Sequence, residues 1–224
     1  ILLPDFGQVQ SDKKVKNLSY NEVVFDENRP FFKEGVELFG KDDLFYSRRI
    51  GKTPSGFFNI YNDLNEGESV IKNPSQVRLL NAFKISGRTN KGLGLGIFNA
   101  VTNNTYAEIE DSSGNVRKVL TEPFTDFNII VVDQQLKNNS GFYVINTHTN
   151  RDKGFSDANV TGAGFRLSNK KNTFLLEGTG ALSERSNASD EENIFEAKPG
   201  YKYMLKASKN GGLDRKSTRL NSSH

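Results

Sequence analysis

The acidic side chains near the start of the chain are the residues best suited to catalysis. The first 34 positions contain Asp5, Asp12, Glu22, Asp26, Glu27 and Glu34. Two carboxyl groups at a suitable separation can hydrolyse a glycosidic bond, one as the acid and the other as the nucleophile. Their spacing selects no such pair. The alternative interpretation is that they are turn residues and ion-pair partners of arginine, whose planar guanidinium suits fixed, bidentate pairing.

Arginine and aromatic residues accompany these carboxylates. Arg29 precedes a proline, and Arg48 and Arg49 follow the aromatic pair Phe45 and Tyr46. An unpaired buried guanidinium is costly, so we expect Arg48 or Arg49 to reach a carboxylate within the first 70 residues. We assign no catalytic, cofactor-binding or metal-binding residue. The positions of possible functional interest are Asp5, Asp12, Glu22, Arg29, Glu34, Arg48 and Arg49.

Composition excludes several other chemistries. The chain has no Cys and two His, which excludes a thiol nucleophile, cysteine-ligated zinc and a histidine-rich metal site. One internal histidine, His148, supports no Ser-His-Asp arrangement and is expected at a lumen or rim. Two acidic loop groups do not match EF-hand spacing, so calcium is not expected: Asp63, Asn65 and Glu68, and Asp190, Glu191 and Glu192. We therefore expect no cofactor and no catalysis in this chain.

The last residues have a different character from the rest. Residues 214–224, DRKSTRLNSSH, resemble the translation of a sequencing-adapter oligonucleotide, and we interpret them as a non-native tail that forms an exposed coil or incidental helix. Without the tail's Asp214, Arg215, Lys216 and Arg219, the net charge of +3 falls to +1. The basic balance is then slight, so no nucleic-acid partner is expected. Because Ile1 is neither Met nor part of a signal peptide, we expect a fragment cut at both ends.

The elements that would position these residues are strands. Residues 1–76 show no sustained period and predict an irregular, motif-rich region with short strands, either a plug or the start of a barrel. Residues 77–213 form segments of alternating character that predict about seven long strands. In the clearest segment, Phe174, Leu176 and Leu182 fall on one face and Thr173, Glu177 and Thr179 on the other.

Connection lengths favour one kind of antiparallel sheet. The connections alternate between short ones, such as residues 89–91 and 137–140, and long ones, such as residues 102–123 and 185–200. Short turns on one rim and long loops on the other are typical of an outer-membrane barrel, whereas alternation alone also fits a soluble sandwich. Within residues 102–123, two strands around Asp111 to Gly114 predict a protruding hairpin.

Spaced motifs in the first 51 residues resemble a bacterial family. PDFGQVQSD (Pro4 to Asp12), RPFFKEG (Arg29 to Gly35) and FYSRRIG (Phe45 to Gly51) resemble the C-terminal domain of unknown function in proteins titled carbohydrate-binding family 9 domain-containing. The segments DANVTG (Asp157 to Gly162) and VVDQQLKNNS (Val131 to Ser140) also fit. The resemblance implies a Gram-negative precursor in which a sugar-binding module, upstream of Ile1, precedes an outer-membrane barrel.

Together these patterns predict an all-β, antiparallel fragment of an outer-membrane-type β-barrel with an irregular N-terminal region. The expected role is the membrane-spanning part of a Gram-negative envelope protein linked to carbohydrate binding or uptake. Its expected partners are outer-membrane lipid and carbohydrate held by the upstream module. The alternative is a soluble β-rich domain of a secreted glycan-processing hydrolase, located outside the cell or in the periplasm.

Overall fold

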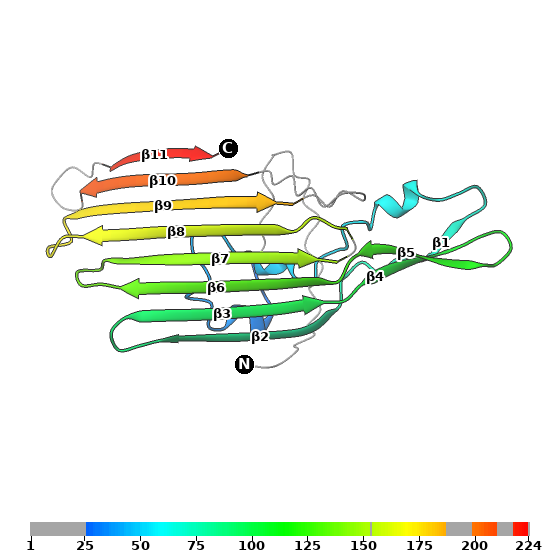
Figure 1. Cartoon of the computed structure of the whole chain (residues 1–224), viewed down its shortest axis with the longest axis horizontal. Coiled ribbons are helices and arrows are strands. Elements are labelled where there is room, and N and C mark those ends of the chain that lie inside the picture. Colours follow the sequence, from blue (N-terminus) through cyan, green and yellow to red (C-terminus); the bar gives the residue numbers. More distant parts are fainter. Residues whose placement is uncertain (1–25, 153, 187–198, 210–216, 224) are drawn as a thin grey trace.

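All paired strands of the protein run antiparallel in the computed structural model (Figure 1). The structure describes residues 26–152, 154–186, 199–209 and 217–223. The main sheet has eight strands in the order β11-β10-β9-β8-β7-β6-β3-β2, and a smaller sheet has three in the order β1-β4-β5. The prediction of an all-β, antiparallel fold is therefore confirmed.

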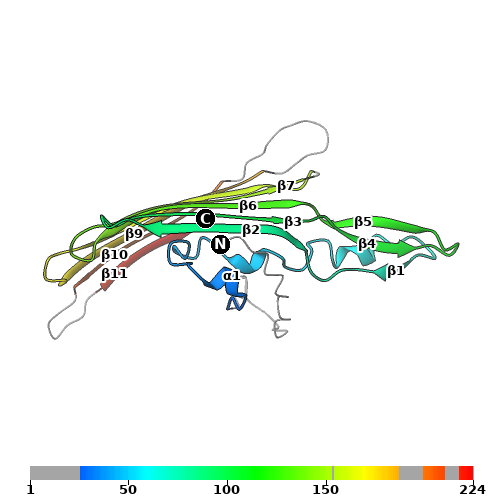
Figure 2. The same ribbon diagram turned by 90° about the horizontal axis from the view of Figure 1, so that it is seen from below.

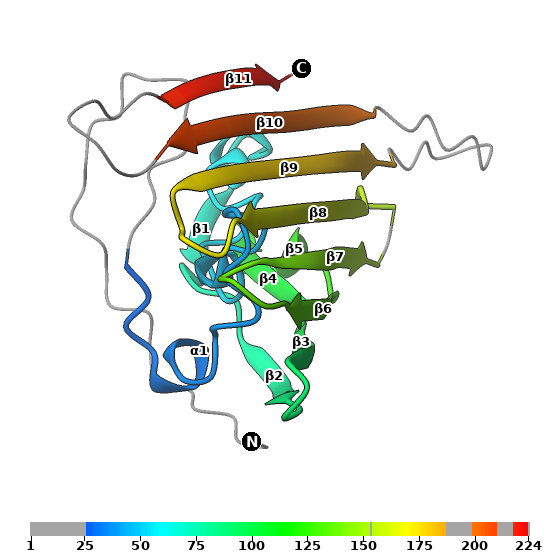
Figure 3. The same ribbon diagram turned by 90° about the vertical axis from the view of Figure 1, so that its left-hand side faces the viewer.

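The long strands of the main sheet are the alternating segments that the sequence predicts. They are β2 (Leu79–Arg88), β3 (Leu93–Thr102), β6 (Thr125–Gln135), β7 (Gly141–Arg151), β8 (Ala158–Ser168), β9 (Phe174–Arg185) and β10 (Gly200–Lys209). Successive side chains of a strand point to opposite faces. Because the sheet is curved, each strand supplies one set of side chains to a concave face and one to a convex face (Figure 3).

The short turns lie together at one end of the main sheet (Figure 1). They connect β2 to β3, β6 to β7, and β8 to β9. The backbone has a positive φ at Gly92, Asn138, Asn139 and Asn172 in these turns, and glycine and asparagine adopt this conformation most readily. The connections from β3 to β6 and from β7 to β8 leave at the opposite end, as the alternation of lengths predicts.

The predicted hairpin extends past the end of the main sheet (Figure 1). Strands β4 (Thr105–Glu110) and β5 (Val116–Glu122) lie between β3 and β6 in the chain and pair with β1 (Ser69–Lys72). Ile60, from the 3-10 helix η2 (Asn59–Asn62), packs with Ala107 and Ile109 in a small separate core.

Part of the first 50 residues covers the concave face (Figure 2). This segment contains the helix α1 (Pro30–Lys33) and the 3-10 helix η1 (Ser47–Arg49). The main core joins this segment to the sheet and contains Phe31, Phe32, Leu38, Phe39, Ile50, Leu79, Ala82, Phe98, Ala100, Ile129, Val131 and Ile145. A Cβ added at Gly96 would lie 3.0 Å from the Phe39 ring, so the absence of a side chain there makes room for the ring.

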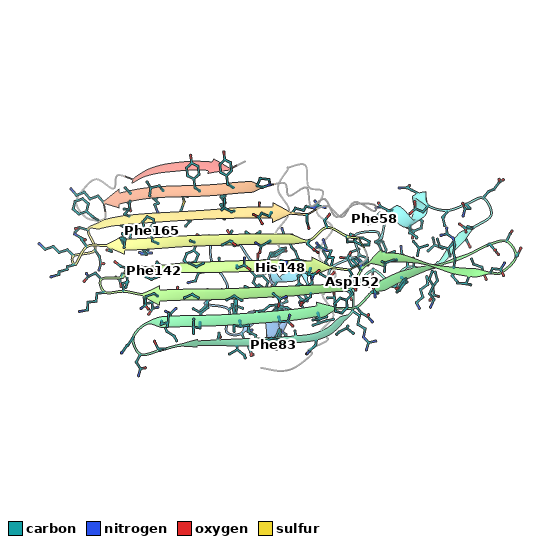
Figure 4. All side chains as sticks on the ribbon, viewed as in Figure 1. Phe58, Phe83, Phe142, His148, Asp152 and Phe165 are labelled. Carbon is teal, nitrogen blue, oxygen red and sulfur yellow. The ribbon has the colours of Figure 1, made fainter. Side chains whose placement is uncertain are left out.

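The convex face exposes large apolar side chains, which we call the apolar band. Its members are Ile85, Leu95, Ile97, Ile130, Val132, Phe142, Val144, Phe165, Leu167, Phe174, Leu176, Leu182, Tyr201, Tyr203 and Leu205. The exposed fraction is 57% for Phe174 and 64% for Leu182. The three residues that the alternation places on the apolar face of β9, Phe174, Leu176 and Leu182, are therefore all exposed. Phe142 and Phe165 lie directly opposite each other on β7 and β8 (Figure 4).

The prediction for the tail is wrong in part. Residues 217–223 form a strand, β11 (Ser217–Ser223), that pairs with β10 at the edge of the main sheet. An exposed strand edge offers unpaired backbone groups to any extended segment, so this pairing needs no particular sequence. The main sheet is open in the described residues, with β2 and β11 at its edges.

Among the described residues, no helix has both the length and the apolar character needed to cross a membrane.

Candidate functional site

Arg29 is the centre of a buried cluster formed by the two arginine motifs. Its guanidinium donates to Glu27 at 2.8 Å, to the Ile50 carbonyl oxygen at 2.8 Å and to the Ser47 carbonyl oxygen at 3.0 Å. The guanidinium carbon also lies 3.8 Å from the centre of the Phe32 ring. Arg29 therefore joins the start of α1 to η1, and its role in this cluster is structural.

Glu27 is the acceptor that neutralises Arg29. Its carboxylate also accepts a hydrogen bond from the Ser47 hydroxyl at 2.6 Å. Burial alone would raise the pKa of Glu27, but the hydrogen bonds from Arg29 and Ser47 outweigh it and lower the pKa to about 2. The carboxylate is therefore ionised near neutral pH and is a poor general acid.

The other arginines of interest occupy η1. Arg48 is buried and donates to the Asp26 carbonyl oxygen at 2.5 Å, whereas Arg49 is exposed. The burial of Arg48 agrees with an internal role, while its expected ion pair with a carboxylate stays a prediction. Glu34 is exposed, and its carbonyl oxygen accepts a hydrogen bond from Lys84. Asp5, Asp12 and Glu22 lie outside the described residues.

A larger polar feature lies on the concave face, in a cavity of about 1040 Å³. Its wall is formed by Lys41 and Asp42 from the N-terminal segment, and its floor by side chains of β6 to β10. The charged lining residues are Lys41, Asp42, Asp133, Arg166, Glu177 and Lys206. Glu177 and Thr179, which the alternation places on the polar face of β9, both line this cavity.

Ion pairs organise the charges around the cavity. Lys41 Nζ lies 2.6 Å from Asp133 Oδ2, and Arg88 also pairs with Asp133. Glu177 lies between Arg166 and Lys206, each with an N–O distance of 3.4 Å. Asp42 and Thr179 make no side-chain hydrogen bond or ion pair within the part of the chain that the structure describes. The hydrogen-bonding capacity of these two groups is therefore unused by the described residues, and we call them the open polar groups of the cavity.

The first acidic loop group contains Glu68, whose carboxylate is hydrogen-bonded by neighbouring residues. Glu68 accepts hydrogen bonds from Arg117 and Asn65, which lower its pKa to about 2. Its oxygens are thus already engaged by protein groups. Across residues 26–152, 154–186, 199–209 and 217–223, no group of His, Asp and Glu is arranged to hold a metal ion. The group at Asp190 lies outside these ranges.

His148 lies on the convex face and not on the concave face that a lumen would require. It lies opposite Asn128 on β6 and Asn159 on β8, in a polar row beside the apolar band. This row is compatible with the other predicted position, a rim.

Sequence reasoning did not single out the cavity residues Lys41, Asp42, Asp133 and Arg166. Asp133 follows four consecutive apolar residues, which hide the alternation of β6. A signal was present in β8 and β9, where Arg166 and Glu177 occupy concave-face positions that lie directly opposite each other.

A family model described as "Domain of unknown function (DUF5916)" matches residues 1–223. Comparison with curated proteins gives no match, and comparison with solved structures gives none either.

Proposed function

The chain belongs to the family of domains of unknown function DUF5916, and from this premise we propose that it is the membrane-spanning β-barrel portion of a Gram-negative envelope protein. In this proposal the convex face of the main sheet contacts outer-membrane lipid, and the concave face lines the barrel interior. The N-terminal segment that covers the concave face acts as a plug. The motifs that resemble carbohydrate-binding family 9 proteins support a link with carbohydrate binding or uptake.

The apolar band is the observation that carries this proposal. From Phe174 to Leu182, β9 rises about 26 Å at about 3.3 Å per residue. The lipid-facing band of outer-membrane barrels is about 25 Å tall and their strands are tilted by about 35–45°, so this segment would span about 19–22 Å of that height. In water such a continuous apolar surface would be costly, because soluble proteins rarely expose large contiguous apolar patches.

Polar groups within the band are arranged as lipid requires. Asn146 lies in the row of Ile130 and Leu182, and it donates hydrogen bonds to Asn159 at 2.9 Å and to Thr161 at 2.8 Å. The Phe165 ring covers Gly178, where an added Cβ would lie 2.4 Å from the ring. Mutual hydrogen bonding and ring coverage reduce the cost of polar groups and of bare backbone in an apolar environment.

The opposite face supports the assignment of inside and outside. On β9, Leu175 and Glu177 alternate with exposed Phe174 and Leu176, and Glu177 forms ion pairs across neighbouring strands. A polar interior and an apolar exterior are characteristic of transmembrane barrels.

The experiment uses the absence of cysteine from the chain. Single variants Val144→Cys, in the apolar band, and Thr179→Cys, in the cavity, are labelled with a nitroxide and mixed with lipid vesicles. We expect molecular oxygen, which concentrates in lipid, to relax the label at position 144. A water-soluble nickel chelate should relax the label at position 179 more strongly.

Thr179→Cys is the matched control, because both labels sit on the same sheet and differ in face. Failure of the protein to associate with vesicles would contradict the proposal. Equal access of the nickel chelate to both labels would contradict it as well.

A further inference from the structure

We propose that the concave-face cavity binds a neutral, hydroxyl-rich ligand. The cavity volume of about 1040 Å³ is at the upper end of the range for small-molecule sites. This inference rests on the proposed function for the route by which a ligand arrives, because a barrel interior is reached from its two mouths. The binding chemistry itself depends only on the side chains that line the cavity.

The charge balance of the cavity argues against an ionic ligand. Three cationic side chains (Lys41, Arg166 and Lys206) are matched by three anionic ones (Asp42, Asp133 and Glu177). Lys41 is paired with Asp133, and both Arg166 and Lys206 are paired with Glu177. An anion would have to displace one of these carboxylates and would also meet the charge of Asp42. A cation could reach the Asp42 carboxylate, but the positive charges of Lys202 and Lys41, which both act on Asp42, oppose its approach.

The open polar groups suit hydroxyls. The Asp42 carboxylate can only accept hydrogen bonds when ionised, while the Thr179 hydroxyl can donate and accept. A hydroxyl-rich molecule supplies donors to Asp42 and acceptors to Thr179 without breaking an ion pair. Hydroxyl groups can also bond to the outer sides of the Arg166–Glu177 pair, since that arginine side chain is 57% exposed.

The backbone at Asp42 allows a closely matched test. Asp42 and its neighbour Asp43 both have a positive φ, at 47° and 58°. Asparagine tolerates this conformation well, so Asp42→Asn and Asp43→Asn should both fold. Only Asp42 lines the cavity. Asp43→Asn therefore controls for the loss of one negative charge in the same turn.

The test measures binding of maltotriose and xylotriose to the full chain by calorimetry, in a detergent without a sugar headgroup. We expect saturable binding of at least one of these neutral probes and no binding of trigalacturonate. Asp42→Asn should weaken binding about three- to ten-fold, because asparagine keeps an acceptor oxygen and loses only the charge that strengthens the hydrogen bond. Asp43→Asn should leave the affinity unchanged. Thr179→Trp, which fills the cavity floor, should abolish binding.

The outcomes separate this inference from the proposed function. Absence of binding by both neutral probes, or tighter binding of trigalacturonate, would overturn the inference. Equal effects of Asp42→Asn and Asp43→Asn would also overturn it. The nitroxide experiment on vesicles reads the convex face and uses no sugar. If the protein failed to associate with membranes but bound maltotriose normally, the proposed barrel function would be contradicted and the proposed cavity site would still be supported.

Discussion

At the scale of single residues, one cluster of hydrogen bonds joins the two arginine motifs. Arg29 contacts Ser47 and Ile50, which are 18 and 21 positions further along the chain. Glu27 accepts from both Arg29 and Ser47, so a single carboxylate connects the two motifs. A guanidinium with several donors in a fixed plane can satisfy this geometry, and lysine cannot. The cluster therefore holds the N-terminal segment in the shape that packs on the concave face.

The first prediction concerns Glu27 and pH. Its folded pKa of about 2 lies below the ordinary value of 4.5, so it stabilises the fold above about pH 4.5. This contribution should disappear as the pH falls from 4.5 towards 2. Glu27→Gln should lower the free energy of unfolding at pH 7 by about 1–2 kcal/mol, after allowance for solvent screening.

Denaturant titrations of both proteins between pH 7 and pH 3 measure this difference. The gap between wild type and Glu27→Gln should narrow at the acid end. Glu37→Gln, which neutralises an exposed carboxylate in the same segment, is the control and should have little effect. A gap that stays constant with pH would contradict the role assigned to the Glu27 charge.

Residue types alone could identify the arginine motifs but not their partners. The cluster depends on the carbonyl oxygens of Ser47 and Ile50. Because every residue has a backbone carbonyl, the sequence does not indicate which ones accept a hydrogen bond. The cavity charges depend on strand register, because Arg166 meets Glu177 only when β8 and β9 pair as they do. A shift of one residue would place these side chains on opposite faces.

At the scale of elements, the strands could be predicted because alternation is a local property. β9 shows it clearly, since its concave positions include polar residues. β6 does not show the alternation, because apolar residues occupy both of its faces. Ile129 and Val131 are buried in the core, while Ile130 and Val132 are exposed in the apolar band. A strand with two apolar faces gives a continuous apolar run, and its faces cannot be told apart without neighbours.

The turns at the short-loop end provide the second prediction, through Gly92. Its φ is +85°, and an added Cβ would lie 2.8 Å from the Gln135 carbonyl oxygen. Gly92→Ala should therefore lower the free energy of unfolding by about 2–3 kcal/mol, because it adds both backbone strain and a clash with backbone. Chemical denaturation with circular dichroism detection measures the loss.

Gly87→Ala is the matched control for Gly92. An added Cβ at Gly87 meets no described atom within 4 Å, and it lies on β2, close to the same turn. Its substitution should change stability little or raise it slightly. If both variants were equally stable, the tight turn at Gly92 would not be required for the β2–β3 hairpin.

At the scale of the whole molecule, one sheet separates two different environments. The concave face carries the core and the charged cavity, and the convex face carries the apolar band. In lipid, every backbone polar group must be paired, so the proposed function requires further strands beside β2 at one edge and beside β10, where the tail strand β11 pairs here, at the other. Those strands would come from further chain or from a second copy. In water, the same edges would remain exposed and the apolar band would need a protein partner.

The final prediction uses energy to decide between these environments. Val144 lies in the middle of the apolar band, where it faces Val132 and Ala163 on the neighbouring strands. If the band crosses lipid, Val144→Arg should lower the free energy of unfolding by about 2–4 kcal/mol in vesicles. Leu176→Arg, closer to the short turns, should cost less because the penalty falls towards the interface. Thr179 faces the cavity, so the loss of stability from Thr179→Arg should be smaller than the loss from Val144→Arg.

In a protein whose convex face met only water, Val144→Arg would change the free energy of unfolding little, because Val144 is 46% exposed. Denaturant titration of the three variants in vesicles therefore separates the cases, since equal penalties at positions 144, 176 and 179 would contradict a lipid-facing band.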